Sequence, residues 1–215
     1  MLTFKKKAVI FDLDGVICFT DQYHYQAWKA LADRLGIYFD EKINNRLRGV
    51  SRMASLKIIL ERSDKVYTPA EKEALAAEKN NTYRQLLKKM SPADLTDEVR
   101  DTLNELRRRG YKLAIGSSSK NTKLILGQIG LETYFDVIAD GTDITHSKPD
   151  PEVFLLAASR LGLAPADCAV VEDAKAGIEA AKACGMTALA LFGDARGCGH
   201  EDYDLASFED LLNVL

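Results

Sequence analysis

Residues 8–15 read AVIFDLDG, and this stretch decides the fold that we expect for the chain. The first four residues are apolar without interruption, which is typical of a strand buried on both faces of a parallel sheet. Asp12 and Asp14 follow directly, and Gly15 allows the chain to turn sharply after them. Because ligands of open α/β sheets bind beyond the carboxyl ends of the strands, the two carboxylates are candidate catalytic residues.

Four further apolar runs resemble the first one. They are KLAIG at 112–116, FDVIA at 135–139, CAVVE at 168–172 and TALALF at 187–192. Helical segments separate most of the runs, and each ends before a glycine; they are 97–109, 121–129, 151–161 and 174–184. A capping-box pattern, SFED at 207–210, predicts the start of a last helix. The alternation predicts an α/β fold, with a parallel sheet flanked by helices and right-handed crossovers.

Residues 19–90 interrupt this alternation, since they contain helical patterns and no convincing strand. The helical patterns lie at 23–35, 40–47, 51–62 and 69–90. Ser91-Pro92 then marks a boundary, because the residue before a proline is disfavoured in the α region. We therefore expect a core domain formed by 1–18 and 91–215, and a helical domain, 19–90, inserted after the first strand.

The composition excludes several classes of protein. The chain has 215 residues, of which 47% are hydrophobic and 28% charged, which is typical of a globular domain rather than a disordered or disulfide-stapled chain. A net charge of −3 argues against a nucleic-acid surface, and no apolar run approaches the ~18 residues of a membrane span. The four cysteines show no metal-binding spacing, and no signal peptide is evident. We expect a cytoplasmic protein without nucleic-acid or membrane partners.

Three later strand ends carry groups that suit anions or cations. GSSSKN at 116–121 offers hydroxyls, a lysine and helix-terminal N–H groups to an anion, although a serine N-cap explains it as well. Lys148 precedes a proline and either neutralises a phosphate or lies in a surface turn. Glu172 and Asp173 suit Mg²⁺, a hard cation that takes oxygen ligands, or begin a solvated helix. Together with Asp12 and Asp14, these groups suit phosphoryl transfer through an aspartyl-phosphate.

These motifs resemble the haloacid dehalogenase superfamily, in its phosphotransferase branch. The core carries FDLDGVI at 11–17, SSSKN at 117–121, SKPDPEVF at 147–154 and VEDAKAGI at 171–178. The insert carries YHYQAWKAL at 23–31, LRGVSR at 47–52 and EKNNTY at 78–83. The resemblance covers most of the chain and weakens after Phe192. It implies a Rossmann-like core and a mobile α-helical cap.

The resemblance also implies roles for the acidic residues. Asp12 would be the nucleophile that becomes phosphorylated, and Asp14 would be the general acid and base. Asp12, Glu172 and Asp173, with the backbone carbonyl of Asp14, would hold Mg²⁺. Ser117 would help to bind the transferring phosphoryl group.

The remaining roles that the resemblance implies concern phosphate binding and the cap. Lys148 would bind the transferring phosphoryl group together with the serine. The other phosphate would be bound by Arg52, Ser119, Lys120 and Asn121. His24 and Lys79 would reach in from the cap and help to place Asp14. Trp28 lies four residues after His24 and shares its helix face, where it either binds substrate or belongs to the core.

The expected activity is Mg²⁺-dependent phosphoryl transfer on a small-molecule sugar phosphate by a monomer. A mutase needs a second phosphate clamp, because its bisphosphate intermediate must be held at either end, and Arg52 with Lys120-Asn121 would supply it. A phosphatase would instead let water discharge the aspartyl-phosphate. A sensor without catalysis is a third hypothesis, which the presence of Asp12, Asp14 and Lys148 disfavours. Phe19 and Thr96-Asp97-Glu98 depart from the family pattern near the expected hinges.

Overall fold

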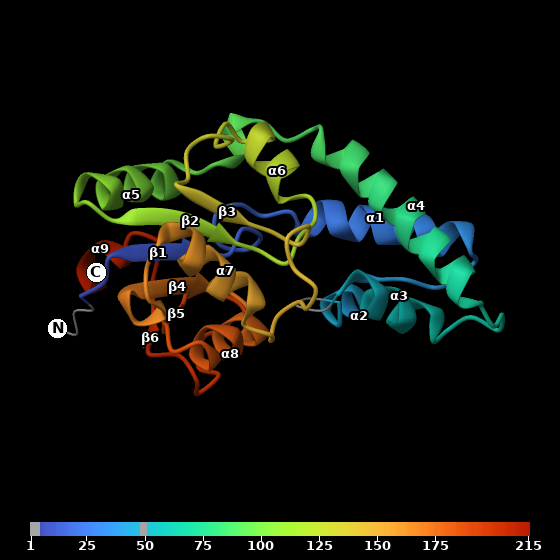
Figure 1. The fold of residues 1–215 in the computed structure, drawn as a ribbon. Helices are drawn as coiled ribbons and strands as arrows, with labels where there is room; N and C mark the ends of the chain where they lie inside the picture. Colours follow the sequence, from blue (N-terminus) through green and yellow to red (C-terminus); the bar gives the residue numbers. More distant parts are fainter. Residues whose placement is uncertain (1–4, 48–50) are drawn as a thin grey trace. The chain divides into compact units, whose positions relative to one another are not determined.

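The computed structural model describes residues 5–47 and 51–215. The chain divides into two compact units, which are Met1–Phe19 with Ser91–Leu215, and Thr20–Met90. The first, here called the α/β unit, contains all the described strands, and the second, the helical unit, contains only helices among its described residues (Figure 1). The helical unit is thus inserted after the first strand.

A six-stranded sheet lies at the centre of the α/β unit. Its order is β3-β2-β1-β4-β5-β6, and all neighbouring strands are parallel. The strands are β1 (Ala8–Phe11), β2 (Lys112–Gly116), β3 (Val137–Ala139), β4 (Cys168–Glu172), β5 (Thr187–Ala190) and β6 (Tyr203–Asp204). Phe11, the last residue of β1, pairs with Ile115 and Val171, so the segments that follow these three strands start at the same edge of the sheet.

Helices connect the strands of the α/β unit. They are α5 (Asp97–Arg108), α6 (Thr122–Gln128), α7 (Glu152–Leu161), α8 (Lys175–Ala183) and α9 (Leu211–Val214), with 3₁₀ turns at Pro92–Asp94 and Pro165–Asp167. Helix α7 begins directly after Pro151, whose fixed φ suits a helix start, and it ends at Gly162 with a φ of 70°. The alternation confirms the predicted α/β class.

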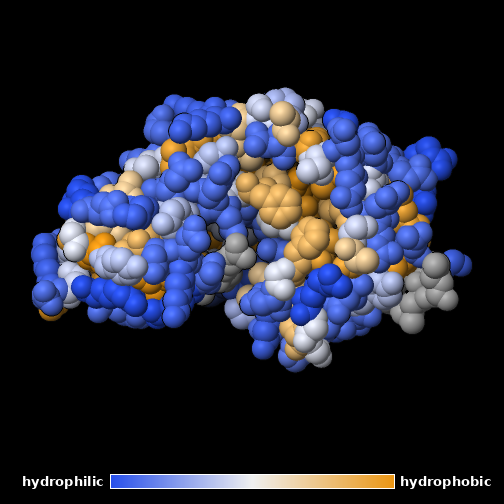
Figure 2. All heavy atoms as spheres, turned by 180° about the vertical axis from the view of Figure 1, so that it is seen from behind, coloured by the Kyte–Doolittle hydropathy of each residue, from blue (hydrophilic) through white to orange (hydrophobic). Residues whose placement is uncertain are grey.

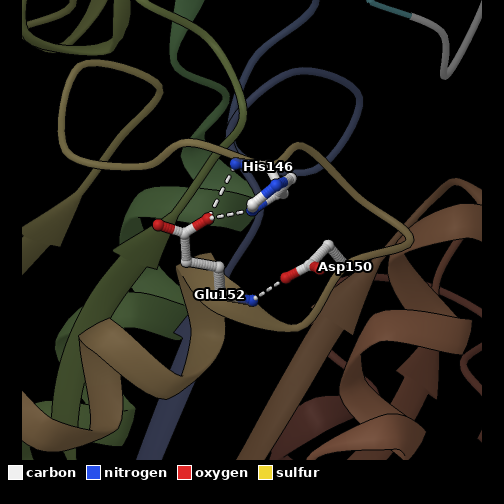
Figure 3. Close-up of side chains that lie close together, drawn as sticks. All are labelled: His146, Asp150 and Glu152. Atoms are coloured by element: carbon white, nitrogen blue, oxygen red, sulfur yellow. Dashed lines mark hydrogen bonds and ion pairs between the residues drawn. The ribbon is translucent and has the colours of Figure 1, made fainter.

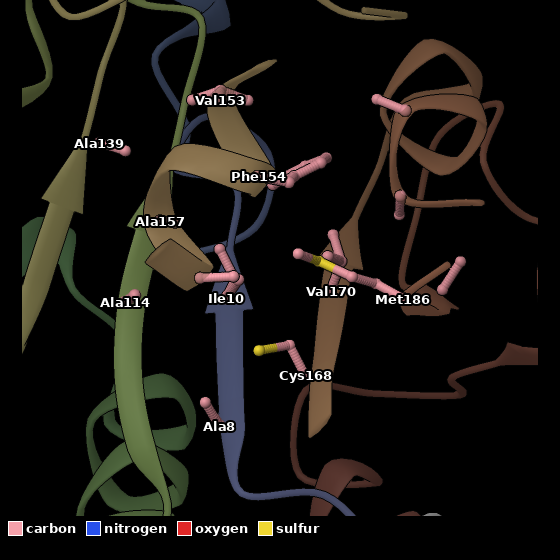
Figure 4. Packing of buried hydrophobic residues seen from close by; sticks show 14 of the residues in the cluster. Ala8, Ile10, Ala114, Ala139, Val153, Phe154, Ala157, Cys168, Val170 and Met186 are labelled. Atoms are coloured by element: carbon pink, nitrogen blue, oxygen red, sulfur yellow. The ribbon is translucent and has the colours of Figure 1, made fainter. Parts of the chain in front are cut away.

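One hydrophobic cluster joins the sheet to α7 and α8. Figure 4 shows Ile10 of β1, Val170 of β4 and Phe154 of α7 gathered on one face of the sheet, and all three are fully buried. Phe11 belongs to the opposite face, since successive strand residues alternate, and its ring stacks on Phe208 at 5.7 Å between centroids. Burial on both faces explains why the strand has no polar position.

The helical unit contains α1 (Asp21–Arg34), α2 (Glu41–Asn45), α3 (Arg52–Leu60) and α4 (Pro69–Leu87). A capping box starts α4: the Thr68 hydroxyl accepts from the Glu71 N–H at 3.2 Å, and the Glu71 carboxylate accepts from the Thr68 N–H at 2.8 Å. Helices α1 and α4 pack against each other. Trp28, Leu56 and Ile59 lie in the hydrophobic cluster of this unit.

Helix and strand ends differ from the predicted ones by a few residues, and one predicted helix start is wrong. The last helix, α9, begins at Leu211 and not at Ser207. The carboxylate of Asp210 instead accepts a hydrogen bond from the Ala206 N–H at 3.2 Å, which closes a turn before the helix. The two-residue strand β6 was not predicted, because so short a segment shows no periodicity.

The surface of the described residues is mainly polar. Figure 2 shows hydrophilic residues over most of one face, with hydrophobic residues exposed between them. Within the α/β unit, the exposed ring of Phe19 contacts that of Phe192, with 6.2 Å between the centroids. Phe19, which departs from the family pattern, thus gains an aromatic neighbour. None of the described helices has the length and apolar character required to cross a membrane.

Candidate active site

Lys148 is hydrogen-bonded to the carboxylates of both Asp12 and Glu172. The three side chains are almost buried, at 8%, 12% and 1% exposure, so they interact away from bulk water. Their positions follow from the sheet: Asp12 comes directly after β1, Glu172 ends the adjacent β4, and the Asp12 N–H donates to the carbonyl of Val171 at 3.0 Å. Lys148 comes from the loop after β3.

The two carboxylates keep Lys148 in its ammonium form. Burial alone would lower its pKa, but the charges and hydrogen bonds of Asp12 and Glu172 outweigh burial and raise the pKa. The Phe154 ring lies beneath the ammonium, at 4.6 Å from its centroid, and adds a cation–π contact. A permanent positive charge therefore stands beside the carboxylate of Asp12.

Glu172 is held by the start of the segment that follows β4. Its carboxylate accepts from the N–H groups of Asp173 at 3.0 Å and Ala174 at 3.1 Å. Gly177 in the next helix is required, because a Cβ there would lie 2.0 Å from the Glu172 carboxyl group. Burial is the main cause that raises the pKa of Glu172, and Lys148 opposes it. Glu172 is therefore an anchored acidic group within the site.

Asp173 adds a further acidic group to this cluster. Burial, followed by the charges of Glu172, Asp12 and Asp14, raises its pKa to about 8. Its carboxylate lies against Gly15, where a Cβ would come within 2.2 Å of Oδ2 and where φ is 90°, so only glycine fits. Asp12, Glu172 and Asp173 offer carboxylate oxygens, and an all-oxygen set of this kind could hold a hard divalent cation.

The turn after Asp12 positions Asp14. The Gly15 N–H donates to the carbonyl of Cys18 at 2.8 Å, and a bridge joins Asp14 and Cys18. Burial, with the charges of Asp14 and Asp12, raises the pKa of the Cys18 thiol, so this cysteine stays protonated and unreactive. Asp14 thus lies in a tight turn two residues after the candidate nucleophile.

The segment after β2 forms a hydroxyl-rich turn. The buried Ser117 accepts from the Ser119 N–H at 3.2 Å, and the Ser119 hydroxyl accepts from the Asn121 N–H at 3.2 Å. Asn121 is buried and Lys120 is exposed. The hydroxyl of Ser118 accepts from the Lys148 N–H at 3.4 Å, which links this turn to the loop of Lys148. Ser118 therefore helps to hold this turn against the loop of Lys148.

The loop that carries Lys148 is fastened by Glu152, the first residue of α7. The Glu152 carboxylate accepts from the N–H groups of Thr145 at 2.9 Å and His146 at 2.7 Å, and it pairs with the His146 imidazole at 3.3 Å (Figure 3). Asp150 in turn accepts from the Glu152 N–H at 2.9 Å. These potential metal ligands are thus engaged in fixing the loop, and they carry no metal assignment.

The helical unit brings together four aromatic or basic side chains from α1 and α4. Lys79 is 2% exposed, and its ammonium donates to Nδ1 of His24 at 2.8 Å. The ammonium also lies 4.7 Å from the ring centroid of Trp28 and 4.5 Å from that of Tyr83. Burial first, and then the charges of Lys79 and Arg52, lower the pKa of His24 well below its usual value. The group combines a buried cation with a neutral imidazole.

Arg52 is the first residue of α3. The hydroxyl of Ser51 caps this helix by accepting from the Ala54 N–H at 3.3 Å. Burial lowers the pKa of Arg52, which is partly exposed. Residues 48–50 of the motif at 47–52 lie outside the described residues. Arg52 therefore presents its guanidinium from a capped helix start.

Within the α/β unit, the structure brings Asp12, Lys148, Glu172 and Asp173 together, as their positions at strand ends suggested. Sequence reasoning missed Glu152, which fastens the loop of Lys148, and Tyr83, whose ring contacts the ammonium of Lys79. A signal was present for Tyr83, since it lies four residues after Lys79 and therefore on the same face of a helix. No local pattern pointed to the fastening role of Glu152.

Comparisons with known proteins show what the sequence and the fold of this chain resemble. The haloacid dehalogenase-like hydrolase family matches residues 6–185. The chain is 44% identical over 187 residues to a β-phosphoglucomutase of Bacillus subtilis (strain 168), covering 86% of this chain and 83% of that protein. It is 35% identical over 182 residues to a fructose-1-phosphate phosphatase of Escherichia coli (strain K12), covering 84% and 94%. A β-phosphoglucomutase crystal structure from Clostridium difficile matches with a TM-score of 0.86 and 37% identity, covering 98% and 93%.

Proposed function

The chain belongs to the haloacid dehalogenase-like hydrolase family, and from this premise we propose that it is a Mg²⁺-dependent β-phosphoglucomutase. It would interconvert β-D-glucose 1-phosphate and glucose 6-phosphate through β-glucose 1,6-bisphosphate. The observation that carries the phosphoryl-transfer chemistry is the buried contact of Lys148 with Asp12 and Glu172 inside a cluster of carboxylates. This arrangement supplies a nucleophile, a fixed positive charge and a cation site at one edge of the sheet. The 44% identity to the Bacillus subtilis β-phosphoglucomutase favours the mutase within that chemistry.

In the first half-reaction, a carboxylate oxygen of Asp12 attacks a phosphorus atom of the bisphosphate. The P–O bond to the sugar breaks, Asp12 becomes an aspartyl-phosphate, and Asp14 gives its proton to the leaving sugar oxygen. Lys148 and the hydroxyl of Ser117 bind the transferring group. Mg²⁺ held by Asp12, Glu172, Asp173 and the Asp14 carbonyl would supply further positive charge at the oxygens of that group.

Transfer of the 1-phosphoryl group leaves glucose 6-phosphate, which is released and replaced by β-glucose 1-phosphate. In the second half-reaction, the free 6-hydroxyl of this substrate takes the phosphoryl group from Asp12. Asp14 removes the proton of this hydroxyl, whose oxygen attacks the phosphorus of the aspartyl-phosphate and releases the carboxylate of Asp12. The bisphosphate forms again. Positioning and charge neutralisation carry most of the catalysis in such transfers.

A mutase must also hold the phosphate that does not react. We assign this role to Arg52, Ser119, Lys120 and Asn121. A guanidinium offers two parallel N–H groups to phosphate oxygens, which makes arginine more suitable than lysine. A simple phosphatase has no need for this second binding group.

The alternative function is a phosphatase for small sugar phosphates. The similarity to the Escherichia coli phosphatase, at 35% identity, favours this second candidate. The two functions share the phosphorylation of Asp12 and differ in what removes the phosphoryl group, a sugar hydroxyl or water. Analysis of the reaction products is therefore needed to distinguish the mutase from the phosphatase.

The experiment follows β-glucose 1-phosphate by ³¹P NMR with Mg²⁺ and a trace of β-glucose 1,6-bisphosphate. The proposed function predicts glucose 6-phosphate that accumulates only with Mg²⁺ and depends on the bisphosphate. Release of inorganic phosphate without isomerisation would establish the phosphatase instead. Absence of both products would contradict phosphoryl transfer on this substrate class.

A further inference from the structure

Tyr83 of α4 makes three contacts inside the helical unit that no role described above uses. The residue is 2% exposed, and its hydroxyl donates to Oγ1 of Thr20 at 2.8 Å. Its ring lies 4.0 Å from the imidazole of His24 between centroids. The same ring lies 4.5 Å from the ammonium of Lys79. One side chain therefore touches both members of the Lys79–His24 pair.

The contact between Lys79 and His24 fixes the position of the imidazole proton. A lysine ammonium has three donors and no acceptor, so Nδ1 of His24 must accept the hydrogen bond at 2.8 Å. Nδ1 then carries no proton, and the single proton of the neutral ring lies on Nε2. The rings of Trp28 and Tyr83 lie 4.7 and 4.5 Å from the ammonium of Lys79, which is cation–π geometry.

The surroundings of His24 agree with a neutral ring. Burial lowers its pKa, and so do the positive charges of Lys79 and Arg52. A second proton on the imidazole would also place a like charge beside the ammonium of Lys79. His24 therefore offers one N–H donor, at Nε2.

We propose that Tyr83 is a positioning residue, which holds His24 and Lys79 so that His24 stays a neutral imidazole with its proton on Nε2. The hydroxyl of Tyr83 anchors its ring to Thr20, next to the start of α1. The ring then lies against both the imidazole and the ammonium, which are in contact with each other at 2.8 Å. Any effect on catalysis rests on the proposed function, in which His24 and Lys79 help to place Asp14. The position of the imidazole proton is independent of that function.

The direct test is ¹⁵N NMR of the histidine rings in the uniformly labelled full-length chain at neutral pH. The chain has three histidines, and a His24→Gln variant identifies the signals of His24. The proposal predicts an unprotonated Nδ1 and a protonated Nε2 in the wild type. A proton on Nδ1, or on both nitrogens, would overturn it.

The role of Tyr83 is tested by removing its ring. Tyr83→Leu should shift the His24 signals towards a mixture of the two tautomers. Tyr67→Leu is the matched control, because it removes another cation–π contact of this unit, that with Lys65 at 4.7 Å, and it should leave His24 unchanged. An unchanged His24 tautomer in folded Tyr83→Leu would overturn the proposal.

A second variant tests the same proposal if Tyr83→Leu does not fold. Trifluorophenylalanine at position 83 keeps the size of the ring but withdraws electron density from its face, which weakens the attraction for a cation. It should shift the His24 tautomer in the same direction as leucine, whereas phenylalanine at this position should shift it less. Equal spectra for the fluorinated and the phenylalanine variants would contradict the role of the ring.

The kinetic readout links this arrangement to the proposed reaction. Tyr83→Leu should lower kcat for isomerisation about tenfold to a hundredfold, since misplaced groups near reacting atoms cost rates of this order. A fall in kcat without a change of the tautomer would contradict the positioning role. If the wild type shows no isomerisation, the proposed function fails, while the NMR result still decides the role of Tyr83.

Discussion

The ammonium of Lys148 is hydrogen-bonded to the carboxylate of Asp12, although 136 residues separate them in the sequence. The parallel sheet brings them together, since Asp12 follows β1 and Lys148 lies in the loop after β3. Both side chains are almost buried, so the pair interacts strongly and Lys148 remains charged. This relationship connects the fold to the proposed chemistry, and the first prediction follows from it.

Replacing Lys148 with methionine removes the charge while keeping the approximate volume. We expect kcat/KM for phosphoryl transfer to fall by about a hundredfold to a thousandfold, the usual loss for a charge-stabilising donor in a buried site. Steady-state kinetics check this. Lys175→Met, which removes an exposed lysine 3.8 Å from Glu179, is the control and should leave the rate unchanged. Equal rates in Lys148→Met and the wild type would contradict the assigned role.

Glu152 should affect catalysis through the loop that carries Lys148. Glu152→Ala removes the acceptor of the Thr145 and His146 N–H groups, and we expect kcat to fall about tenfold because Lys148 is less well placed. Glu152→Gln keeps an acceptor oxygen and should restore most of the rate. His146→Ala removes only the exposed ion pair and serves as the control. A glutamine variant as slow as the alanine variant would argue against this explanation.

Binding of Mg²⁺ alone should stabilise the chain against unfolding. A cation among Asp12, Glu172 and Asp173 offsets the repulsion between their carboxylates. At a concentration of a hundred times its Kd, a bound ion raises the free energy of unfolding by about 2.7 kcal/mol. Thermal unfolding with and without Mg²⁺ measures the effect. Asp173→Asn should lose most of the rise in Tm, whereas Asp101→Asn, an exposed acidic residue of α5, should keep it. A full rise in the Asp173 variant would exclude this residue as a ligand.

Arg52→Lys should separate isomerisation from the phosphorylation of Asp12. Lysine keeps the positive charge but loses the planar pair of donors, so we expect kcat/KM for isomerisation to fall about tenfold, or ~1.4 kcal/mol. Phosphorylation by a small donor such as acetyl phosphate should not change, since it has no second phosphate. Arg46→Lys, at an exposed ion pair with Glu61, is the control. Equal losses in both reactions would contradict the assignment of Arg52 to the second phosphate.

Asp143 should make stability depend on acid pH. Arg160 binds its carboxylate through two N–H···O contacts of 3.0 Å, and this lowers the pKa of Asp143 to about 2. Because the pKa of Asp143 is lower in the folded chain than in the unfolded chain, its ionised carboxylate stabilises the fold at pH values above the unfolded pKa, near 3.8. This stability is lost as the pH falls towards 2. After allowance for solvent, Asp143→Asn should cost about 1 kcal/mol at pH 7. Urea unfolding between pH 2 and 7 checks this, and an unchanged pH profile in the variant would contradict it.

The strands and their connections could be predicted well from the sequence. β1, β2 and β4 have the predicted bounds, because each is a continuous apolar run that turn or polar residues delimit. β6 and α9 could not be predicted, since a two-residue strand and a four-residue helix depend on the sheet and the turns beside them. Local pattern is therefore sufficient only for elements long enough to show a period.

The candidate site was predictable where strand ends converge, and less so where side chains pack. Asp12 and Glu172 follow adjacent strands, so their proximity follows from the topology. The contacts of Tyr83 with Thr20 and of Glu152 with its loop depend on the packing of helices and turns. The sequence indicates which residues have suitable chemistry, and the folded chain shows which others hold them.

The most direct test of the central claim is the location of the phosphoryl group on the enzyme. The chain is incubated with Mg²⁺ and β-glucose 1,6-bisphosphate labelled in its phosphates, quenched, digested and analysed by mass spectrometry. We predict a labelled peptide with the phosphoryl group on Asp12 in the wild type and no labelling in Asp12→Ala. Labelling of the Asp12→Ala chain to the level of the wild type would contradict the account.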